Sequence, residues 1–315
     1  MNQEYAAGDL AVHVEHLTRT FRGKVALHEV SLQIPVGSIF GLVGLNGAGK
    51  TTLIRHLIGS LKAQHGSVTV LGDDPVRNPE GVLKQVGYLT EEDTLPKWMR
   101  VGDLIDFTRG VFPTWDDAYA KQLCETFSLT RATRLQSLSK GQRARAGLLV
   151  AIAHRPELLV LDEPSSGLDP IARSDILEAI IRTISEDGRT VLFSSHLLDE
   201  VDRVCDSVAL MHEGEIIESL KTEQLETRNS EILCRVEARQ SAAPVVAGAF
   251  GWRPAGQEWS AVVESKVFDE ASLPKEFSII ERRDITLGRW FGARVGNSTV
   301  VSEDNANASE VTADA

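Results

Sequence analysis

Cysteine is scarce in this sequence: there are three in 315 residues, at Cys124, Cys205 and Cys234. They lie far apart and form no CxxC pair, which argues against a zinc site and against a disulfide framework. A small odd number of cysteines is typical of a protein from a reducing compartment such as the cytosol. We therefore expect all three to be small buried hydrophobic residues.

Long hydrophobic runs are absent as well. No apolar stretch approaches the roughly 20 residues that a membrane-spanning helix needs. The longest uncharged stretch is residues 38–49, which is rich in glycine, and the first ten residues contain Glu4 and Asp9 but no basic cluster. The sequence therefore predicts neither a spanning helix nor a signal peptide. Work at a membrane would require docking onto another chain that spans it.

The chain also lacks a surplus of positive charge. Its formal net charge is -12 and its pI is about 5.2. Proteins that bind nucleic acid over a broad surface are usually basic, so we expect no direct contact with nucleic acid. No internal repeat is visible, which indicates one copy of the main domain rather than a tandem pair.

Strand and helix patterns alternate along most of the chain. Strands are expected at residues 11–21, 30–34, 38–44, 67–72, 86–89, 157–164 and 190–196, and helices at residues 50–61 and 171–188. Most of residues 92–157 has helical character. Such alternation indicates an α/β protein with a largely parallel sheet.

The pattern changes after about residue 228. Further strands are expected at residues 231–239, 258–265 and 277–287, with short helices between them. We therefore predict a main domain at residues 1–228 that includes a helical subdomain at about 92–157. A small α+β domain would follow at residues 229–300, and a disordered acidic tail at 301–315, where acidic side chains occur without basic or aromatic ones.

The strongest motif is GLNGAGKT at residues 44–51, which fits the P-loop pattern G-x-x-x-x-G-K-[ST] between a strand and a helix. Glycines let successive backbone N–H groups turn toward phosphate oxygens, and the following helix N-terminus favours negative charge. Lys50 is expected to hold the β- and γ-phosphates of ATP, and Thr51 to offer its hydroxyl to Mg²⁺. The predicted nucleotide-binding residues here are Gly44, Leu45, Asn46, Gly47, Ala48, Gly49, Lys50, Thr51 and Thr52.

A second motif is the apolar strand LLVLDEP, which ends in two carboxylates, Asp162 and Glu163. We expect Asp162 to bind Mg²⁺ through water, as in other P-loop proteins. Glu163 is predicted to be the general base that polarises the attacking water.

A third motif is Leu138-Ser139-Lys140-Gly141-Gln142. Together with the order of the other motifs, it resembles the ATP-binding-cassette (ABC) ATPases, whose signature is LSGGQ, over about residues 10–225. The resemblance implies a P-loop NTPase core with an antiparallel β subdomain and a helical insert. It also implies that Ser139, Gly141 and Gln142 meet the γ-phosphate bound to a second subunit. Lys140 replaces the first glycine of the family's pair and is expected to point to solvent.

Other positions follow from the same resemblance. Phe21 occupies the place where the family stacks an aromatic ring on adenine, with a strand-core residue as the alternative. Residues 165–169 (SSGLD) resemble the D-loop, which makes Asp169 a predicted interface residue near the nucleotide. His196 resembles the switch histidine that contacts the γ-phosphate, and we count it with Glu163 as catalytic.

One position departs from the family pattern. The family usually has glutamine in the loop after VGYL, where this chain has Glu91. A carboxylate suits Mg²⁺, so Glu91 is predicted to bind the metal through water and to lie near the nucleotide. The alternatives are that it repels the γ-phosphate, or that it is simply solvated.

The resemblance implies partners as well as chemistry. Each nucleotide would be held between two ABC ATPase subunits, in a homodimer or a heterodimer, beside a separate membrane permease that determines the substrate. The chain would then be cytoplasmic and peripheral on the inner face of the cell membrane. Residues 95–106 would face the permease, with Trp98 and Met99 as docking side chains. The alternative for Trp98 is a place in the subdomain core.

The direction of transport is expected to be export, because residues 112–116 (FPTWD) and LSKGQ are similar to bacterial export cassettes of the antibiotic-responsive type. The competing interpretation is a soluble ABC ATPase that acts on ribosomes or DNA. A non-catalytic scaffold is disfavoured because Lys50, Asp162 and Glu163 are all present.

Overall fold

The computed structural model describes residues 9–92, 94–236, 243–256 and 258–295. The chain divides into two compact units, Met1–Thr222 and Glu223–Ala315. The division falls at the start of helix α8 (Thr222–Arg228), and the boundary expected after residue 228 is at the end of the same helix. The tail expected at residues 301–315 lies outside the described residues.

The first unit is built on a six-stranded sheet in the order β5-β6-β7-β3-β8-β9. Its strands are β3 (Ile39–Val43), β5 (Val86–Leu89), β6 (Leu158–Asp162), β7 (Thr190–Ser195), β8 (Ser207–His212) and β9 (Glu215–Lys221). The pairs β5–β6, β6–β7, β7–β3 and β3–β8 are parallel, and only β9 runs antiparallel to its neighbour. The largely parallel sheet predicted from the sequence is confirmed.

A second sheet of three antiparallel strands has the order β2-β1-β4. Its strands are β1 (Leu10–Phe21), β2 (Lys24–Pro35) and β4 (His65–Val70). A two-residue turn at Arg22 and Gly23, both with positive φ, joins β1 to β2, and such turns suit the right-handed twist of hairpin strands. This is the antiparallel β subdomain that the family resemblance implied.

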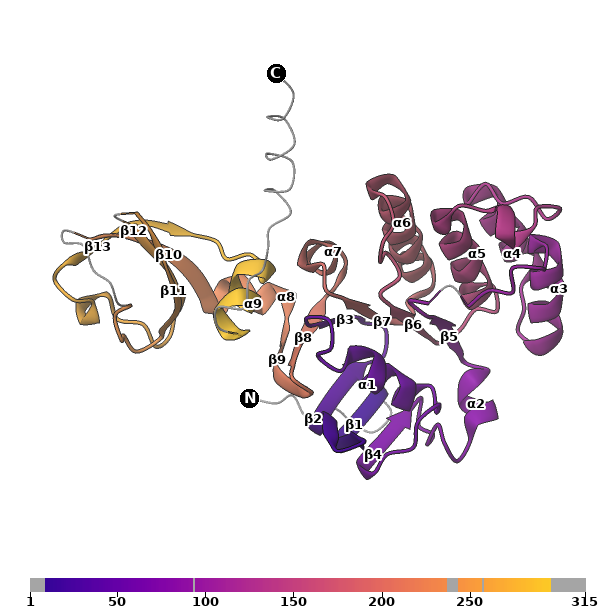
Figure 1. Ribbon diagram of the computed structural model, residues 1–315, viewed down its shortest axis with the longest axis horizontal. Coiled ribbons are helices and arrows are strands. Elements are labelled where there is room, and N and C mark those ends of the chain that lie inside the picture. Colours follow the sequence, from indigo (N-terminus) through magenta and orange to yellow (C-terminus); the bar gives the residue numbers. More distant parts are fainter. Residues whose placement is uncertain (1–8, 93, 237–242, 257, 296–315) are drawn as a thin grey trace, which may run out of the picture. The chain divides into compact units, whose positions relative to one another are not determined.

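Helices cover both faces of the large sheet (Figure 1). The helices of the first unit are α1 (Lys50–Leu57), α2 (Pro79–Leu83), α3 (Val101–Val111), α4 (Asp117–Thr126), α5 (Lys140–Ile152), α6 (Pro170–Asp187) and α7 (Leu198–Val204), with a 3₁₀ turn η1 (Leu135–Ser137). In Figure 1, α6 and α7 lie above the sheet, whereas α1 lies below it, beside the β1–β2–β4 sheet. The helices α3, α4 and α5 form the predicted helical insert.

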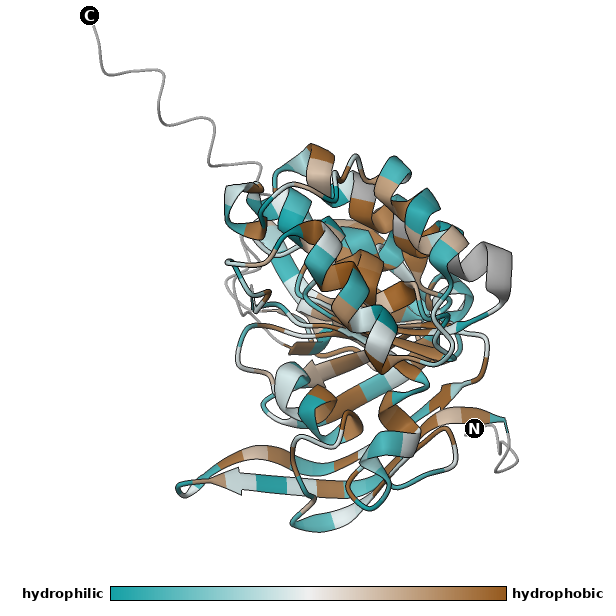
Figure 2. Ribbon diagram, turned by 90° about the vertical axis from the view of Figure 1, so that its right-hand side faces the viewer, coloured by the Kyte–Doolittle hydropathy of each residue, from teal (hydrophilic) through white to brown (hydrophobic). Residues whose placement is uncertain are grey.

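The main core of this unit fills the space between the two sheets and α1. Its fully buried members include Leu17, Ile34, Leu53, Ile54 and Leu192. Figure 2 shows hydrophobic strands in the middle of this unit, and helices that carry both hydrophilic and hydrophobic residues. Among the described residues, no helix has the length and apolar character needed to cross a bilayer.

The second unit is a four-stranded antiparallel sheet in the order β11-β12-β10-β13. Its elements are β10 (Asn229–Val236), β11 (Ala249–Ala255), β12 (Glu258–Glu264), a 3₁₀ turn η2 (Glu270–Ser272), β13 (Phe277–Arg283) and α9 (Leu287–Val295). Trp259 and Phe277 belong to its hydrophobic cluster, and Trp290 of α9 is fully buried. The small α+β domain expected from the sequence therefore has its own core.

Candidate active site

Three neighbouring parallel strands bring the predicted catalytic residues to one edge of the large sheet. Val43 at the end of β3 pairs with Ser195 of β7, and Ser194 pairs with Asp162 at the end of β6. The segments that follow these strands are the P-loop, Glu163 and His196. Ligands of open α/β sheets bind beyond the carboxyl ends of the strands, so this edge is the expected site.

The P-loop glycines have backbone reasons for their identity. Gly47 and Gly49 have φ values of +83° and +112°, which side chains with a Cβ rarely adopt. A Cβ on Gly49 would lie 2.9 Å from the carbonyl oxygen of Ala26, and a Cβ on Gly44 would collide with the carbonyl oxygen of Met211. The loop is thus held against β2 and β8 at the point where α1 begins.

Lys50 is nearly fully buried at the start of α1. Its Nζ donates to the carbonyl oxygen of Gly44 at 2.6 Å and lies 3.0 Å from Oε1 of Glu163. The exposed fractions of the Lys50 and Glu163 side chains are 6% and 5%. Ionisable groups taken out of water need such a contact, so each of these side chains has the partner that its burial requires.

Asp162 lies directly beside Thr51, as the magnesium prediction requires. Burial raises the pKa of the Asp162 carboxyl, while hydrogen bonds from the hydroxyls of Ser194 (2.8 Å) and Thr51 lower it. Oδ2 of Asp162 is buried and has no hydrogen-bond partner among the described residues. A carboxylate oxygen in that state, next to a hydroxyl, fits a hard divalent cation such as Mg²⁺.

A Mg²⁺ ion held here would draw few ligands from the protein. Among the described residues there is no cluster of three or more histidine, cysteine or acidic side chains that could hold a metal by itself. Mg²⁺ usually takes one or two protein ligands and completes its shell with water and substrate phosphates, so the Thr51 hydroxyl and the Asp162 carboxylate would be enough to hold it.

Glu163 and His196 contact each other directly. Nδ1 of His196 lies 2.7 Å from Oε2 of Glu163, and the backbone N–H of Glu163 donates to Oγ of Ser194 at 3.0 Å. Glu163 has a φ of 48°, an unusual value for a residue with a side chain and one found at functional sites held by their surroundings. The carboxylate is therefore fixed between Lys50 and His196.

The signature segment forms the N-terminus of α5. Ser139 caps the helix: its hydroxyl accepts from the backbone N–H of Gln142, and the side chain of Gln142 accepts from the N–H of Ser139. Gly141 faces α6 closely, since a Cβ there would lie 2.8 Å from Cβ of Ala172. Lys140 is exposed as predicted, but its ammonium group lies against Gly167 instead of only facing solvent.

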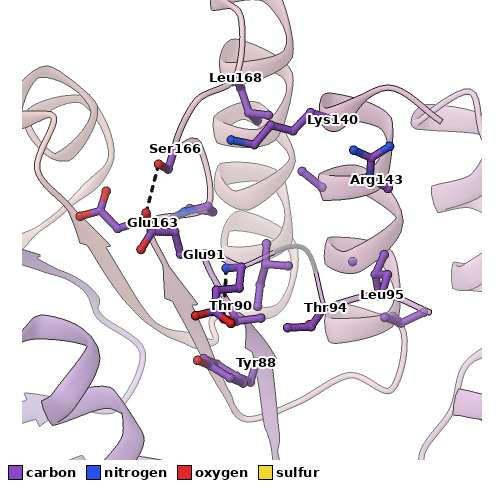
Figure 3. Close-up of a pocket in the computed structure, with 16 residues that line it drawn as sticks. Tyr88, Thr90, Glu91, Thr94, Leu95, Lys140, Arg143, Glu163, Ser166 and Leu168 are labelled. Carbon is purple, nitrogen blue, oxygen red and sulfur yellow. Dashed lines mark hydrogen bonds between the residues drawn. The ribbon is translucent and has the colours of Figure 1, made fainter. Parts of the chain in front are cut away.

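Glu91 lines a pocket between the loop after β5, the first turns of α5 and the segment after β6 (Figure 3). Lys140, Glu163 and Ser166 also line this pocket, whose volume is about 110 Å³. The hydroxyl of Ser166 donates to Oε1 of Glu91 at 3.3 Å. Glu91 is near enough to Asp162 that its charge helps to raise the Asp162 pKa, but its metal-binding role stays a prediction.

Two further predicted residues have clear local roles. Phe21 ends β1 with 40% of its surface exposed, and the guanidinium carbon of Arg19 lies 4.6 Å from its ring centroid. It is therefore not a strand-core residue, and its role in stacking on adenine stays a prediction. Asp169 caps α6 through the backbone N–H groups of Ile171 and Ala172, at 3.1 and 3.0 Å.

Sequence reasoning missed two buried polar residues at this site, Ser194 and Glu200. Ser194 bridges Asp162 and the backbone of Glu163, and Glu200 accepts hydrogen bonds from the hydroxyls of Ser165 and Ser195. The two serines that end the strand before His196 were a signal that could have been used, because polar residues at the carboxyl end of a central strand often serve a site.

Residues 27–166 match the protein family described as ABC transporter. The chain is 33% identical over 233 residues to the ABC transporter ATP-binding protein YdbJ of Bacillus subtilis, which covers 73% of this chain and 76% of that protein. It is 31% identical to the bacitracin transport ATP-binding protein BcrA of Enterococcus faecalis, over 70% of this chain and 72% of that protein.

A solved structure of the ATP-binding subunit of an ABC transporter has the same fold. It superposes with a TM-score of 0.63 and 25% sequence identity, over 69% of this chain and 92% of that one. The match in fold, the P-loop with its buried lysine, and the acidic end of β6 agree with one another. The chain belongs to the ABC transporter family and carries that family's ATP-binding cassette, which hydrolyses ATP.

Proposed function

We propose that this chain is the ATP-hydrolysing subunit of an ABC exporter, working as a dimer of cassettes beside a separate membrane permease. The observation that carries the catalytic part is the line of contacts from Lys50 through Glu163 to His196, at the ends of adjacent strands. Phosphoryl transfer needs mainly positioning and charge stabilisation, and these are what such a line of fixed charges supplies.

Each residue has one task in this proposal. The P-loop N–H groups and Lys50 bind the β- and γ-phosphates, and Thr51 and Asp162 hold Mg²⁺, which neutralises phosphate charge. Glu163 accepts a proton from the attacking water, and His196, 2.7 Å away, orients that carboxylate. Phe21, with 40% of its surface exposed, stacks on the adenine ring.

ATP also moves Lys50 into its working state. Lys50 pairs with Glu163 at 3.0 Å, and a γ-phosphate at the P-loop competes for the same ammonium group. Once Lys50 turns to the phosphate, the carboxylate of Glu163 is released to accept the water proton. Nucleotide binding thereby prepares the base as well as the substrate.

Dimer formation follows from the position of the signature. Ser139, Gly141 and Gln142 form the first turn of α5, whose N–H groups suit an anion. In the proposal this turn meets the γ-phosphate held by a second cassette, so ATP joins two subunits and hydrolysis separates them. The carboxylate of Asp169 caps α6, which fixes the start of that helix next to the D-loop.

Permease docking is assigned to the surface before α3. Trp98 has 73% of its surface exposed, which supports docking and argues against a place in the subdomain core. Large aromatic side chains are common anchors of protein interfaces. Export is supported by the likeness of the signature region to export cassettes. BcrA, the relative whose name describes bacitracin transport, supports a role in transport without giving its direction.

The catalytic proposal is tested with Glu163→Gln. We expect this variant to bind MgATP, to lose at least 100-fold in turnover, and to form a stable dimer with ATP in light scattering. Glu157→Gln, an exposed glutamate at the opposite end of β6, is the matched control and should keep wild-type turnover. Wild-type turnover by Glu163→Gln would remove Glu163 from the mechanism.

The transport proposal is tested by purifying the tagged chain from detergent-solubilised membranes. We expect a multi-span membrane protein in stoichiometric amount, and its loss with Trp98→Ala but not with Val36→Ala, a second exposed apolar position. Co-purification of ribosomes or DNA in place of a membrane protein would favour the soluble alternative.

A further inference from the structure

Glu200 of α7 is a buried carboxylate beneath the proposed catalytic residues. Only 4% of its surface is exposed. Oε2 accepts hydrogen bonds from the hydroxyl of Ser165 at 2.6 Å and from that of Ser195 at 3.2 Å, and Oε1 lies 3.3 Å from Nε of Arg173. A buried carboxylate with such partners is strongly held, because moving it would leave charge unpaired in a dry site.

The partners of Glu200 lie next to the two residues that we propose as catalytic. Ser195 directly precedes His196, and Ser165 follows Glu163 by two positions. Since His196 and Glu163 are themselves 2.7 Å apart, the contacts close a ring. It runs from Glu163 along the chain to Ser165, across to Glu200, back through Ser195 to His196, and returns to Glu163.

The ring joins segments that are far apart in the sequence. One oxygen atom of Glu200 holds both the segment after β6 and the end of β7, and Arg173 adds the first turn of α6. Ser195 is further fixed because its Oγ accepts from the backbone N–H of Leu197 at 3.0 Å. The carboxylate of Glu200 thus fixes the separation of the Glu163 and His196 side chains through the segments that carry them.

We propose that Glu200 is a positioning residue for ATP hydrolysis, which holds His196 and Glu163 at the distance at which His196 orients the carboxylate. The inference rests on the proposed roles of Glu163 and His196. Glu200 does not contact the P-loop through any of these bonds, so its effect falls on the chemical step and not on nucleotide binding.

The expected size follows from how steeply catalysis depends on geometry. A misplacement of about 1 Å in a catalytic group costs up to about 100-fold in rate. Removing an outer residue that orients a reacting side chain typically lowers activity by about 10- to 100-fold. We expect Glu200→Ala to lower kcat about 10- to 100-fold while KM for MgATP changes by less than about threefold.

Conservative replacement separates positioning from stability. Glu200→Gln keeps a side-chain carbonyl oxygen that can accept from Ser165 and Ser195. It removes the charge and places an NH₂ group, which is a donor, opposite Arg173. It should restore kcat to within about fivefold of wild type. Asp199→Ala, which removes an exposed carboxylate from the same turn of α7, is the matched control and should keep wild-type kcat and KM.

A second experiment breaks the ring of contacts at Ser195. Ser195→Ala should lower kcat by at least about fivefold, and it should add little to Glu200→Ala, because residues in one hydrogen-bonded network are not additive. All rates are measured well below the thermal midpoint of each variant. If Glu200→Ala does not fold, the kcat of Ser195→Ala decides the question.

The outcomes separate this inference from the proposed mechanism. An inactive Glu163→Gln together with wild-type kcat in Glu200→Ala and Ser195→Ala would overturn the positioning role alone. Wild-type turnover by Glu163→Gln would overturn the proposed mechanism instead. Positioning by Glu200 would also be refuted if kcat of Glu200→Ala fell only in proportion to the loss of folded protein. The same holds if KM for MgATP changed by as large a factor as kcat.

Discussion

We predict that acid destabilises the helical insert through His154. The residue has only 1% of its surface exposed, and its ring stacks on Phe112 with the centroids 3.9 Å apart. Burial lowers the pKa of His154 to about 4 from the ordinary 6.5. At a pH between these two pKa values, His154 is protonated in the unfolded chain and neutral in the folded insert. The stability contributed by neutral His154 is therefore complete above about pH 6.5 and is lost as the pH falls toward 4.

The magnitude follows from the two pKa values. Proton linkage between the two pKa values lowers the free energy of unfolding by about 2 kcal/mol between pH 7 and pH 5. This corresponds to roughly a 20-fold increase in the fraction of molecules in which the insert is locally unfolded. Because surrounding groups relax, this is an upper bound. The loss should appear first in the elements beside the ring, which are the segment after α3 with Phe112, α5 with Val150 and β5 with Val86.

Hydrogen exchange followed by mass spectrometry is the suitable assay, because it reports the opening of single elements. We expect protection of the α5 peptide (Lys140–Ile152) to fall by up to about 20-fold from pH 7 to pH 5, after correction for intrinsic exchange rates. His154→Leu has no titratable ring and should abolish this dependence, whereas His65→Gln, at an exposed histidine, should retain it. Equal pH dependence in wild type and His154→Leu would refute the reasoning.

Three further predictions concern other parts of the chain. Gly44→Ala should destabilise the first unit by about 1–3 kcal/mol and weaken ATP binding, because its Cβ meets the carbonyl oxygen of Met211; thermal unfolding and nucleotide titration check this. Asp116→Ala removes the cap of α4, bonded to Tyr119 N–H at 2.9 Å, and should cost about 1 kcal/mol at pH 7 in denaturant unfolding. The Tyr119 N–H and Arg155 hold the pKa of Asp116 below its usual 3.8, so this contribution is present above that value and fades as the pH falls through the lowered one. Arg289→Ala breaks bonds to Glu231 (2.5 Å) and the carbonyl of Gly251 (2.8 Å), and should destabilise the second unit by about 2 kcal/mol, measured as faster exchange in β12, with no change in ATP turnover.

Most elements of the first unit could be predicted because their patterns are local. The predicted strand at residues 86–89 has the same first and last residues as β5. The predicted helix at residues 171–188 differs from α6 by one residue at each end. Apolar runs bounded by glycine and helical spacing of isoleucines carry that information in the sequence itself. The P-loop is the extreme case, since its glycines, lysine and threonine serve one short backbone segment.

Two of the strands that escaped prediction, β8 and β11, have clear physical reasons for doing so. β11 contains Gly251 and Pro254, residues that argue against a strand interior, and it tolerates them because it is an edge strand with one unpaired side. β8 is a short apolar segment, and such segments cannot be assigned by periodicity alone. In both cases the neighbouring strand decides what the segment becomes.

The sequence by itself determined the type of fold, the nucleotide loop and the identity of the acidic and histidine groups, because each depends on residues close together in the chain. Only the tertiary structure decided how those groups meet: Lys50 with Glu163, Ser194 with Asp162, and Glu200 with both Ser165 and Ser195. These contacts join residues from separate strands and helices. Their distances arise from strand order and register in the large sheet, which no single segment encodes.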